Sequence, residues 1–113
     1  MVSDRGHPVG ALNPPQVVAF PDEIDLVNSG PFAEQLRAAF ASGAAVVVAD
    51  LTRATYCDTS GARVLLVATK QAAAAHVELR VALPEGNVRR TLRLLGLDSL
   101  LRIYSTVAEA LIT

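Results

Sequence analysis

The run from Ala44 to Ala49 constrains the fold of this chain more than any other segment. Its six consecutive residues are apolar, three of them are valine, and Asp50 follows directly. A short apolar run of this composition is typical of a strand that is covered on both faces, as the inner strands of parallel sheets are. We therefore expect this segment to be a central strand of a sheet.

Helical periodicity appears on either side of this run. Pro31 suits the first position of a helix and Gly43 suits the residue just beyond a helix end. Between them, the apolar residues repeat at helical spacing: Phe32, Leu36, Ala39 and Phe40. A second helix is predicted from Ala62 to Ala75, and its buried stripe would be Val64, Leu65, Ala68 and Ala72.

The remaining segments complete an alternating pattern. Strands are expected at Val17 to Phe20, at Val77 to Leu83, where apolar residues alternate, and at Arg102 to Tyr104. A short basic helix would end at Gly96. A last helix would open on a capping box, Thr106 with Glu109, and end at Leu111.

The order is therefore β-α-β-α-β-α-β-α, which predicts right-handed crossovers, a largely parallel sheet and the α/β fold class. We expect residues 1–15 to form an irregular arm or a short edge strand, because they are rich in proline and glycine, and residues 16–113 to form the domain.

Composition excludes several classes of function. The 113 residues suit one domain, and no apolar run approaches the roughly 18 residues of a membrane span. A net charge of -1 and the absence of Trp argue against nucleic-acid binding. With a single Cys and two His, we expect neither a disulfide nor a metal site or other cofactor. A cytoplasmic protein fits best, because no signal-peptide pattern is present.

The segment from Asp58 to Gly61, with the sequence DTSG, carries the most functional information. It places two hydroxyl groups, Thr59 and Ser60, at the start of the predicted second helix. A helix start tolerates negative charge, so a phosphate on either hydroxyl could be accommodated without unfolding the domain. The alternative is purely structural, because Asp58 or Thr59 is also an ordinary helix cap.

Two enzymatic interpretations have less support. Asp50 or Asp58 could accept a phosphate, but Lys70, the only lysine, lies within a predicted helix rather than at a strand end. Cys57 could act as a nucleophile with His76 as its base, but their spacing does not support this pair. The basic residues Arg89, Arg90 and Arg93 are interpreted as a solvated helix face.

Three segments together resemble STAS domains, especially bacterial anti-anti-sigma factors, also called anti-sigma factor antagonists. They are FPDEIDLVNSGPFAEQL, VVVADLTRATYCDTSGARVLL and RTLRLLGLDSLLRIYSTVAEAL. The resemblance runs from about Val17 to Leu111. It implies a sheet of four or five strands, parallel or mixed, packed against about four helices.

The resemblance also implies a non-enzymatic protein that binds an anti-sigma factor, itself a serine/threonine kinase. That kinase would phosphorylate Thr59, with Ser60 as the fallback acceptor, and a phosphatase would reverse the modification. Asp25, Asn28, Asp58 and Gly61 would lie with these two residues at the partner surface. For Asp25 and Asn28, turn or cap chemistry is an equal alternative.

This chain departs from the family pattern in two places near the acceptor. Thr59 stands where serine is more usual, and Ala62 replaces a customary leucine. Two other functions stay open. One is a STAS scaffold subunit of a larger signalling assembly, rather than a monomer or weak homodimer. The other is a small enzyme or nucleotide-binding domain, although no glycine-rich phosphate loop is visible.

Overall fold

The computed structural model of the chain describes residues 13–112. Its main sheet has four strands, all parallel, in the order β1-β3-β5-β6. The bounds are β1 Gln16–Ala19, β3 Val46–Asp50, β5 Glu78–Ala82 and β6 Arg102–Tyr104. The helices are α2 Ser29–Phe40, α3 Thr59–Ala74, α4 Asn87–Leu94 and α5 Val107–Ile112. The predicted α/β class and the alternating order are confirmed.

The central position of the apolar run is also confirmed. Strand β3 lies between β1 and β5, with Val47 opposite Gln16 on one side and Leu79 on the other. Val47, Val48 and Ala49 are each 0% exposed. Successive side chains of a strand point to opposite faces. Burial of all three therefore requires a covering layer on both faces of the sheet.

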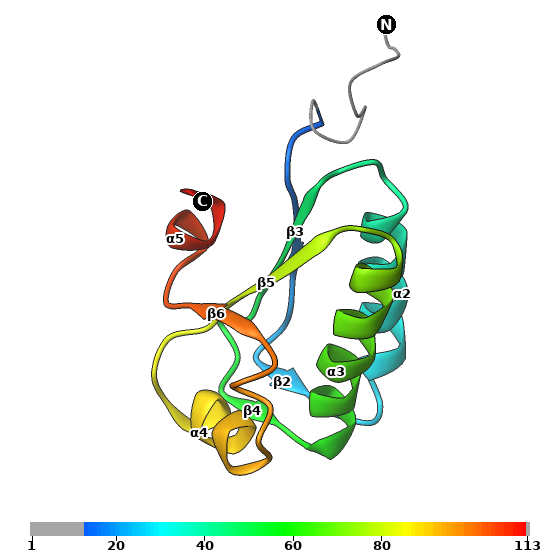
Figure 1. Cartoon of the computed structure of the whole chain (residues 1–113). Helices are drawn as coiled ribbons and strands as arrows, with labels where there is room; N and C mark the ends of the chain where they lie inside the picture. Colours follow the sequence, from blue (N-terminus) through cyan, green and yellow to red (C-terminus); the bar gives the residue numbers. More distant parts are fainter. Residues whose placement is uncertain (1–12, 113) are drawn as a thin grey trace, which may run out of the picture.

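The helices supply these two layers (Figure 1). Helices α2 and α3 lie side by side on one face, and α5 lies on the other. The main core forms between the sheet and the α2–α3 layer, where Leu36 and Leu65 are almost fully buried. Burying a leucine contributes about 1.5–3 kcal/mol, so this layer contributes much of the stability of the fold.

The α5 face contains a buried charge that periodicity does not reveal. Arg80 on β5 is only 4% exposed. Its guanidinium donates to the carbonyl oxygen of Ala110 at 2.7 Å and to the carboxylate of Glu78 at 2.7 Å. Arg80 thereby ties the last turn of α5 to the sheet.

Several predicted boundaries were wrong by a few residues. The first strand begins at Gln16 rather than Val17, α2 begins at Ser29 rather than Pro31, and α3 begins at Thr59 rather than Ala62. For α3 the reason is the cap described below, which starts the helix well before its first apolar residue. The predicted arm over residues 1–15 lies mostly outside the described residues, which begin at Asn13.

The sequence analysis missed two short strands. Strand β2, Glu23–Ile24, and strand β4, Tyr56–Cys57, pair in parallel as a separate small sheet. Each has two residues, which is too short for a period-2 pattern to be visible. They lie near the start of α3, at the end of the molecule where the strands of the main sheet terminate (Figure 1).

The helix ends follow the predicted chemistry, with one exception. Gly43 and Gly96 have φ of 92° and 75°, the left-handed region that favours glycine after a helix. After α3 this position is taken by His76, with φ of 58°. Its neighbour Val77 donates back to the carbonyl of Ala72 at 2.8 Å, which closes the helix end in the same way.

Candidate functional site around Thr59

The small sheet ties together the two loops that form the site. Ile24 of β2 lies opposite Cys57 of β4. The backbone amide of Asp58 then donates to the carbonyl oxygen of Ile24 at 3.1 Å. The amide of Thr55 also donates to the carbonyl of Asp22, at 2.7 Å. The start of α3 is therefore held against the loop that precedes α2.

Asp58 caps α3, which confirms the structural interpretation of this residue. Its backbone is extended, and its carboxylate accepts from the amide of Gly61 at 3.0 Å. Its carbonyl accepts from the amide of Ala62 at 3.0 Å, which begins the helical ladder. The cap satisfies an amide at the helix start that would otherwise lack a partner.

Thr59 is the first residue of α3, and its side chain is exposed. Within the described part of the chain its hydroxyl makes no hydrogen bond. Ser60 is half-buried. A modification of Thr59 would therefore break no hydrogen bond within residues 13–112, and the positive end of the α3 dipole favours an added anion there.

Gly61 lies inside the molecule, although it was predicted as a partner contact. A β-carbon at this position would lie 2.7 Å from the sulfur of Cys57 and 2.7 Å from a methyl group of Ile24. Both distances are below van der Waals contact. The absence of a side chain at Gly61 therefore lets α3 pack closely against the small sheet.

Asp25 and Asn28 build the turn between β2 and α2. The carboxylate of Asp25 accepts from the amides of Val27 at 3.0 Å and Asn28 at 3.2 Å. The side chain of Asn28 accepts from the amide of Asp25 at 3.0 Å and donates to the carbonyl of Glu23 at 2.7 Å. Turn chemistry thus accounts for both residues, and the turn lies on the loop that is tied to Asp58.

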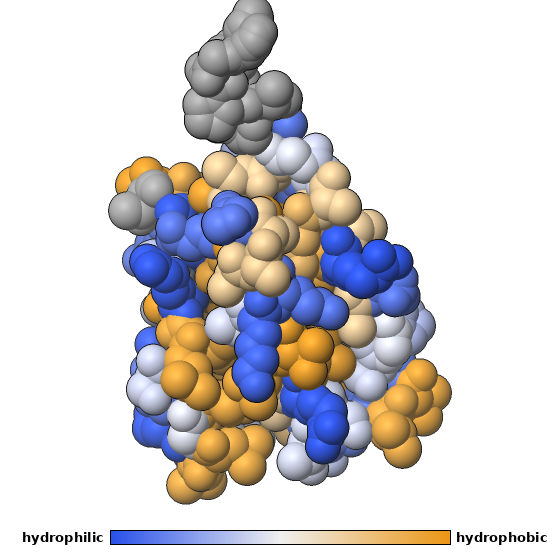
Figure 2. Space-filling view, turned by 45° about the vertical axis from the view of Figure 1, so that its right-hand side comes forward, coloured by the Kyte–Doolittle hydropathy of each residue, from blue (hydrophilic) through white to orange (hydrophobic). Residues whose placement is uncertain are grey.

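Apolar side chains are exposed around this end of the molecule. The turn leaves Leu26 and Val27 76% and 89% exposed, and Leu94 at the end of α4 is 80% exposed. Figure 2 shows orange apolar groups at the lower end, separated by polar ones. Single exposed apolar side chains are normal on a protein surface, so these residues matter only through their position beside the loops that hold the start of α3.

Sequence reasoning missed other residues that share a groove with Thr59. The helix supplies Arg63, Leu66 and Lys70, and the segment after α4 supplies Leu95 and Leu97. The positions of Arg63 and Lys70, four and eleven residues after Thr59, could have indicated that they share a helix face. Leu95 and Leu97 could be placed there only by the fold.

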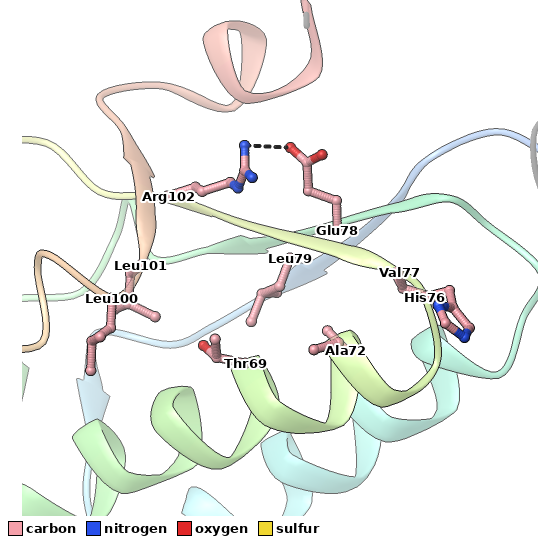
Figure 3. A pocket seen from close by; sticks show the side chains of 10 residues that line it. Thr69, Ala72, His76, Val77, Glu78, Leu79, Leu100, Leu101 and Arg102 are labelled. Carbon is pink, nitrogen blue, oxygen red and sulfur yellow. Dashed lines mark ion pairs between the residues drawn. The ribbon is translucent and has the colours of Figure 1, made fainter.

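A second groove lies further along α3, between the second half of the helix, β5 and the segment that leads into β6 (Figure 3). Its floor is apolar and includes Ala72, Leu79 and Leu101, and an ion pair of 3.5 Å joins Glu78 to Arg102 at its edge. His76 lines it near the end of α3. This groove therefore lies toward the end of α3 opposite Thr59.

The structure also argues against Cys57 and His76 as a catalytic pair, in agreement with their spacing in the sequence. Cys57 lies two residues before α3 and His76 lies two residues after it, and a helix of 16 residues is about 24 Å long. Cys57 is also buried, and burial followed by the nearby Asp58 charge raises the pKa of its thiol to about 11. A thiol in this environment is a poor nucleophile at neutral pH.

The described residues contain neither a cluster of metal-ligating side chains nor a membrane-spanning helix. In residues 13–112, no group of three or more His, Cys, Asp and Glu side chains is arranged to hold a metal ion. The same part of the chain contains no helix with the length and apolarity needed to cross a membrane.

Comparisons with known proteins agree with this fold. Residues 11–110 match the model of the STAS domain family. The anti-sigma-F factor antagonist RsfB of Mycobacterium tuberculosis is 28% identical over 95 residues, which are 84% of this chain and 77% of RsfB. The crystal structure of an anti-sigma factor antagonist from Mycobacterium paratuberculosis is 25% identical with a TM-score of 0.75, over 84% of this chain and 80% of that one.

The fold is also that of SpoIIAA, an anti-sigma factor antagonist of Bacillus. Its unphosphorylated form has a TM-score of 0.71 at 18% identity, over 86% of this chain and 84% of SpoIIAA. Its phosphorylated form has a TM-score of 0.62 at 19% identity, over 83% and 85%. Because the family model spans almost the whole chain and the fold agrees with it, this chain belongs to the STAS domain family, and its relatives include anti-sigma factor antagonists.

Proposed function

We propose that this protein is an anti-sigma factor antagonist that binds an anti-sigma factor with serine/threonine kinase activity. Phosphorylation of Thr59 switches the interaction off, and a phosphatase restores it. The protein acts in the cytoplasm as a monomer or weak homodimer and catalyses no reaction itself. The observation that carries the proposal is the exposed Thr59 at the start of α3, whose hydroxyl makes no hydrogen bond within residues 13–112, in a chain whose relatives include anti-sigma factor antagonists.

The position of Thr59 suits a switch that changes binding rather than folding. A phosphate adds about -1.5 to -2 charges, and it would lie next to Asp58, whose carboxylate already occupies the cap. Two added charges about 5 Å from a partner carboxylate are repelled by roughly 1.7 kcal/mol in water and by about 6.6 kcal/mol at an effective dielectric of 20. About 4 kcal/mol is a thousandfold in affinity, so at the lower effective dielectric of an interface one phosphate is enough to reverse binding.

The surrounding residues divide into two groups in this proposal. Asp25, Asn28 and Asp58 shape the loops, and the exposed Leu26 and Val27 are presented on the turn that they build. Gly61 is buried, and its lack of a side chain lets the start of α3 pack closely against the small sheet. The direct contacts to the partner are made by Thr59 and its exposed neighbours.

The test is incubation of the full chain with the kinase-type anti-sigma factor of its own organism and Mg-ATP, followed by mass spectrometry. We expect one phosphate on the wild type and on the matched control Ser60→Ala, and none on Thr59→Val, which keeps the shape of the side chain without the hydroxyl. A complex that forms without phosphate transfer to Thr59 or Ser60 would refute the switch. Failure of the two proteins to associate at all would refute the function.

A further inference from the structure

A groove of about 440 Å³ runs along the exposed flank of α3, starting at Thr59. One wall is the helix and the other is the segment that follows α4. Its lining residues on α3 are spaced so that they fall on one helix face. The lining residues are Thr59, Ala62, Arg63, Leu66, Val67, Lys70, Leu95 and Leu97.

The interior of this groove is apolar. Ala62 is buried at its floor, Leu66 and Leu97 are half-buried, and Val67 and Leu95 are 44% and 47% exposed. Single exposed apolar residues are normal on protein surfaces. Here, however, these apolar residues line one continuous depression next to the proposed acceptor hydroxyl. A concave apolar surface of this kind suits the binding of an apolar side chain from a partner.

The groove also carries positive charge without a counter-charge. Arg63 and Lys70 are both exposed, and within residues 13–112 neither of them forms an ion pair. No acidic side chain is among the lining residues. Arg37 and Arg102, which lie outside the groove, do pair with carboxylates: Arg37 with Glu34 at 2.7 Å and Arg102 with Glu78 at 3.5 Å.

We propose that this groove docks an acidic amphipathic segment of the partner protein. Apolar side chains of the segment fill the floor at Ala62 and Leu66. Its carboxylates meet Arg63 and Lys70, which are seven residues apart and therefore about 10 Å apart along the helix. An acidic helix with carboxylates two turns apart matches this spacing. The inference rests on the proposed function, because it names the chemistry of the segment by which the partner binds.

The same groove connects docking to the proposed phosphorylation of Thr59. Residues four apart on a helix are neighbours, so a phosphate on Thr59 lies beside Arg63. The phosphate competes with the partner carboxylate for that guanidinium, since an Arg–phosphate pair is a strong charge-assisted contact. It also repels the other carboxylates of the segment. Phosphorylation therefore weakens docking by both effects.

The experiment selects a phage-displayed random peptide library on the immobilised full-length, unphosphorylated protein. The groove variant is R63E/K70E, and the control is R37E/R102E, which changes the net charge equally outside the groove. Circular dichroism verifies that both variants are folded. We expect the wild type and the control to enrich peptides that combine acidic and apolar residues, and the groove variant to lose them.

A synthetic copy of one enriched peptide then provides affinities and a map. We expect each single reversal, R63E or K70E, to weaken binding about fivefold, and amide shifts in the NMR spectrum to concentrate on α3 and residues 95–97. The inference is overturned if no peptide is enriched, if the peptides carry no net negative charge, or if the groove variant binds them as tightly as the wild type. The peptide experiment needs no kinase, whereas phosphorylation of Thr59 is tested by the mass-spectrometry experiment described above. Failure of one proposal can therefore be distinguished from failure of the other.

Discussion

Replacing Gly61 by alanine tests how closely α3 must approach the small sheet. The new β-carbon would lie 2.7 Å from the Cys57 sulfur, 2.7 Å from an Ile24 methyl group and 3.1 Å from the Ile24 carbonyl oxygen. Overpacking of this kind costs about 1–3 kcal/mol. Alanine also gains up to about 1 kcal/mol of helix propensity over glycine. We therefore expect a net loss of up to about 2 kcal/mol of unfolding free energy.

Gly30 provides the matched control. It lies in the first turn of α2, as Gly61 does in α3, and a β-carbon there would meet no atom within 4 Å. Gly30→Ala therefore receives the propensity gain without the clash. The difference in unfolding free energy between the two variants isolates the clash, and we expect it to be about 1–3 kcal/mol. Urea unfolding followed by circular dichroism measures it.

A third variant tests whether the Cys57 sulfur causes the loss of unfolding free energy in Gly61→Ala. Cys57→Ala removes one of the two closest atoms, so it should cost less stability in the Gly61→Ala background than in the wild type, by about 0.5 kcal/mol or more. Equal stability of Gly61→Ala and Gly30→Ala would refute the close packing of α3 on the small sheet. If the effects of Cys57→Ala and Gly61→Ala on the unfolding free energy were additive, the sulfur would not be a source of the clash.

Three further predictions concern stability. Asp58→Ala should lower the unfolding free energy by about 1 kcal/mol through loss of the cap to Gly61, whereas Asp58→Asn should keep most of it; equal losses in urea unfolding would show that the side chain does not cap. His76→Gly should raise stability by up to about 1 kcal/mol, because φ of 58° strains any residue with a β-carbon, while Gly96→Ala should lower it; a lower melting temperature of His76→Gly would contradict this. Because the folded-state pKa of Cys57 is raised from 9.0 to about 11, its contribution to stability is complete below pH 9 and is lost as the pH rises towards 11. The urea midpoint should fall over this range in the wild type and less in Cys57→Ala, and identical pH profiles would refute the assignment.

Local sequence patterns were enough to predict the main elements. The apolar run at Ala44 to Ala49, the helical repeat up to Gly43 and the strand at Arg102 to Tyr104 all depend on neighbours within a few residues. One half of the final capping box is also formed: the amide of Glu109 donates to the hydroxyl of Thr106 at 3.0 Å. Its carboxylate, however, accepts from the amide of Ser105 rather than that of Thr106.

The candidate site was only partly predictable. DTSG at the start of a helix follows from the sequence, because a cap and a helical repeat are local features. The packing of Gly61 could not be predicted, since its neighbours Ile24 and Cys57 come from two strands of two residues each. Such strands carry no periodicity, and their pairing is decided by which loops the main sheet places together.

The sequence by itself determined the order of the helices and of the strands of the main sheet, the parallel arrangement of that sheet and the position of Thr59 at a helix start. Only the tertiary structure decided that Arg80 is buried under α5, and that Leu95 and Leu97 form a wall of the groove beside Thr59. The physical reason is the range of the interactions. Periodicity and caps are fixed by residues within one or two turns, whereas burial and grooves depend on segments that are distant in the chain and meet only on folding.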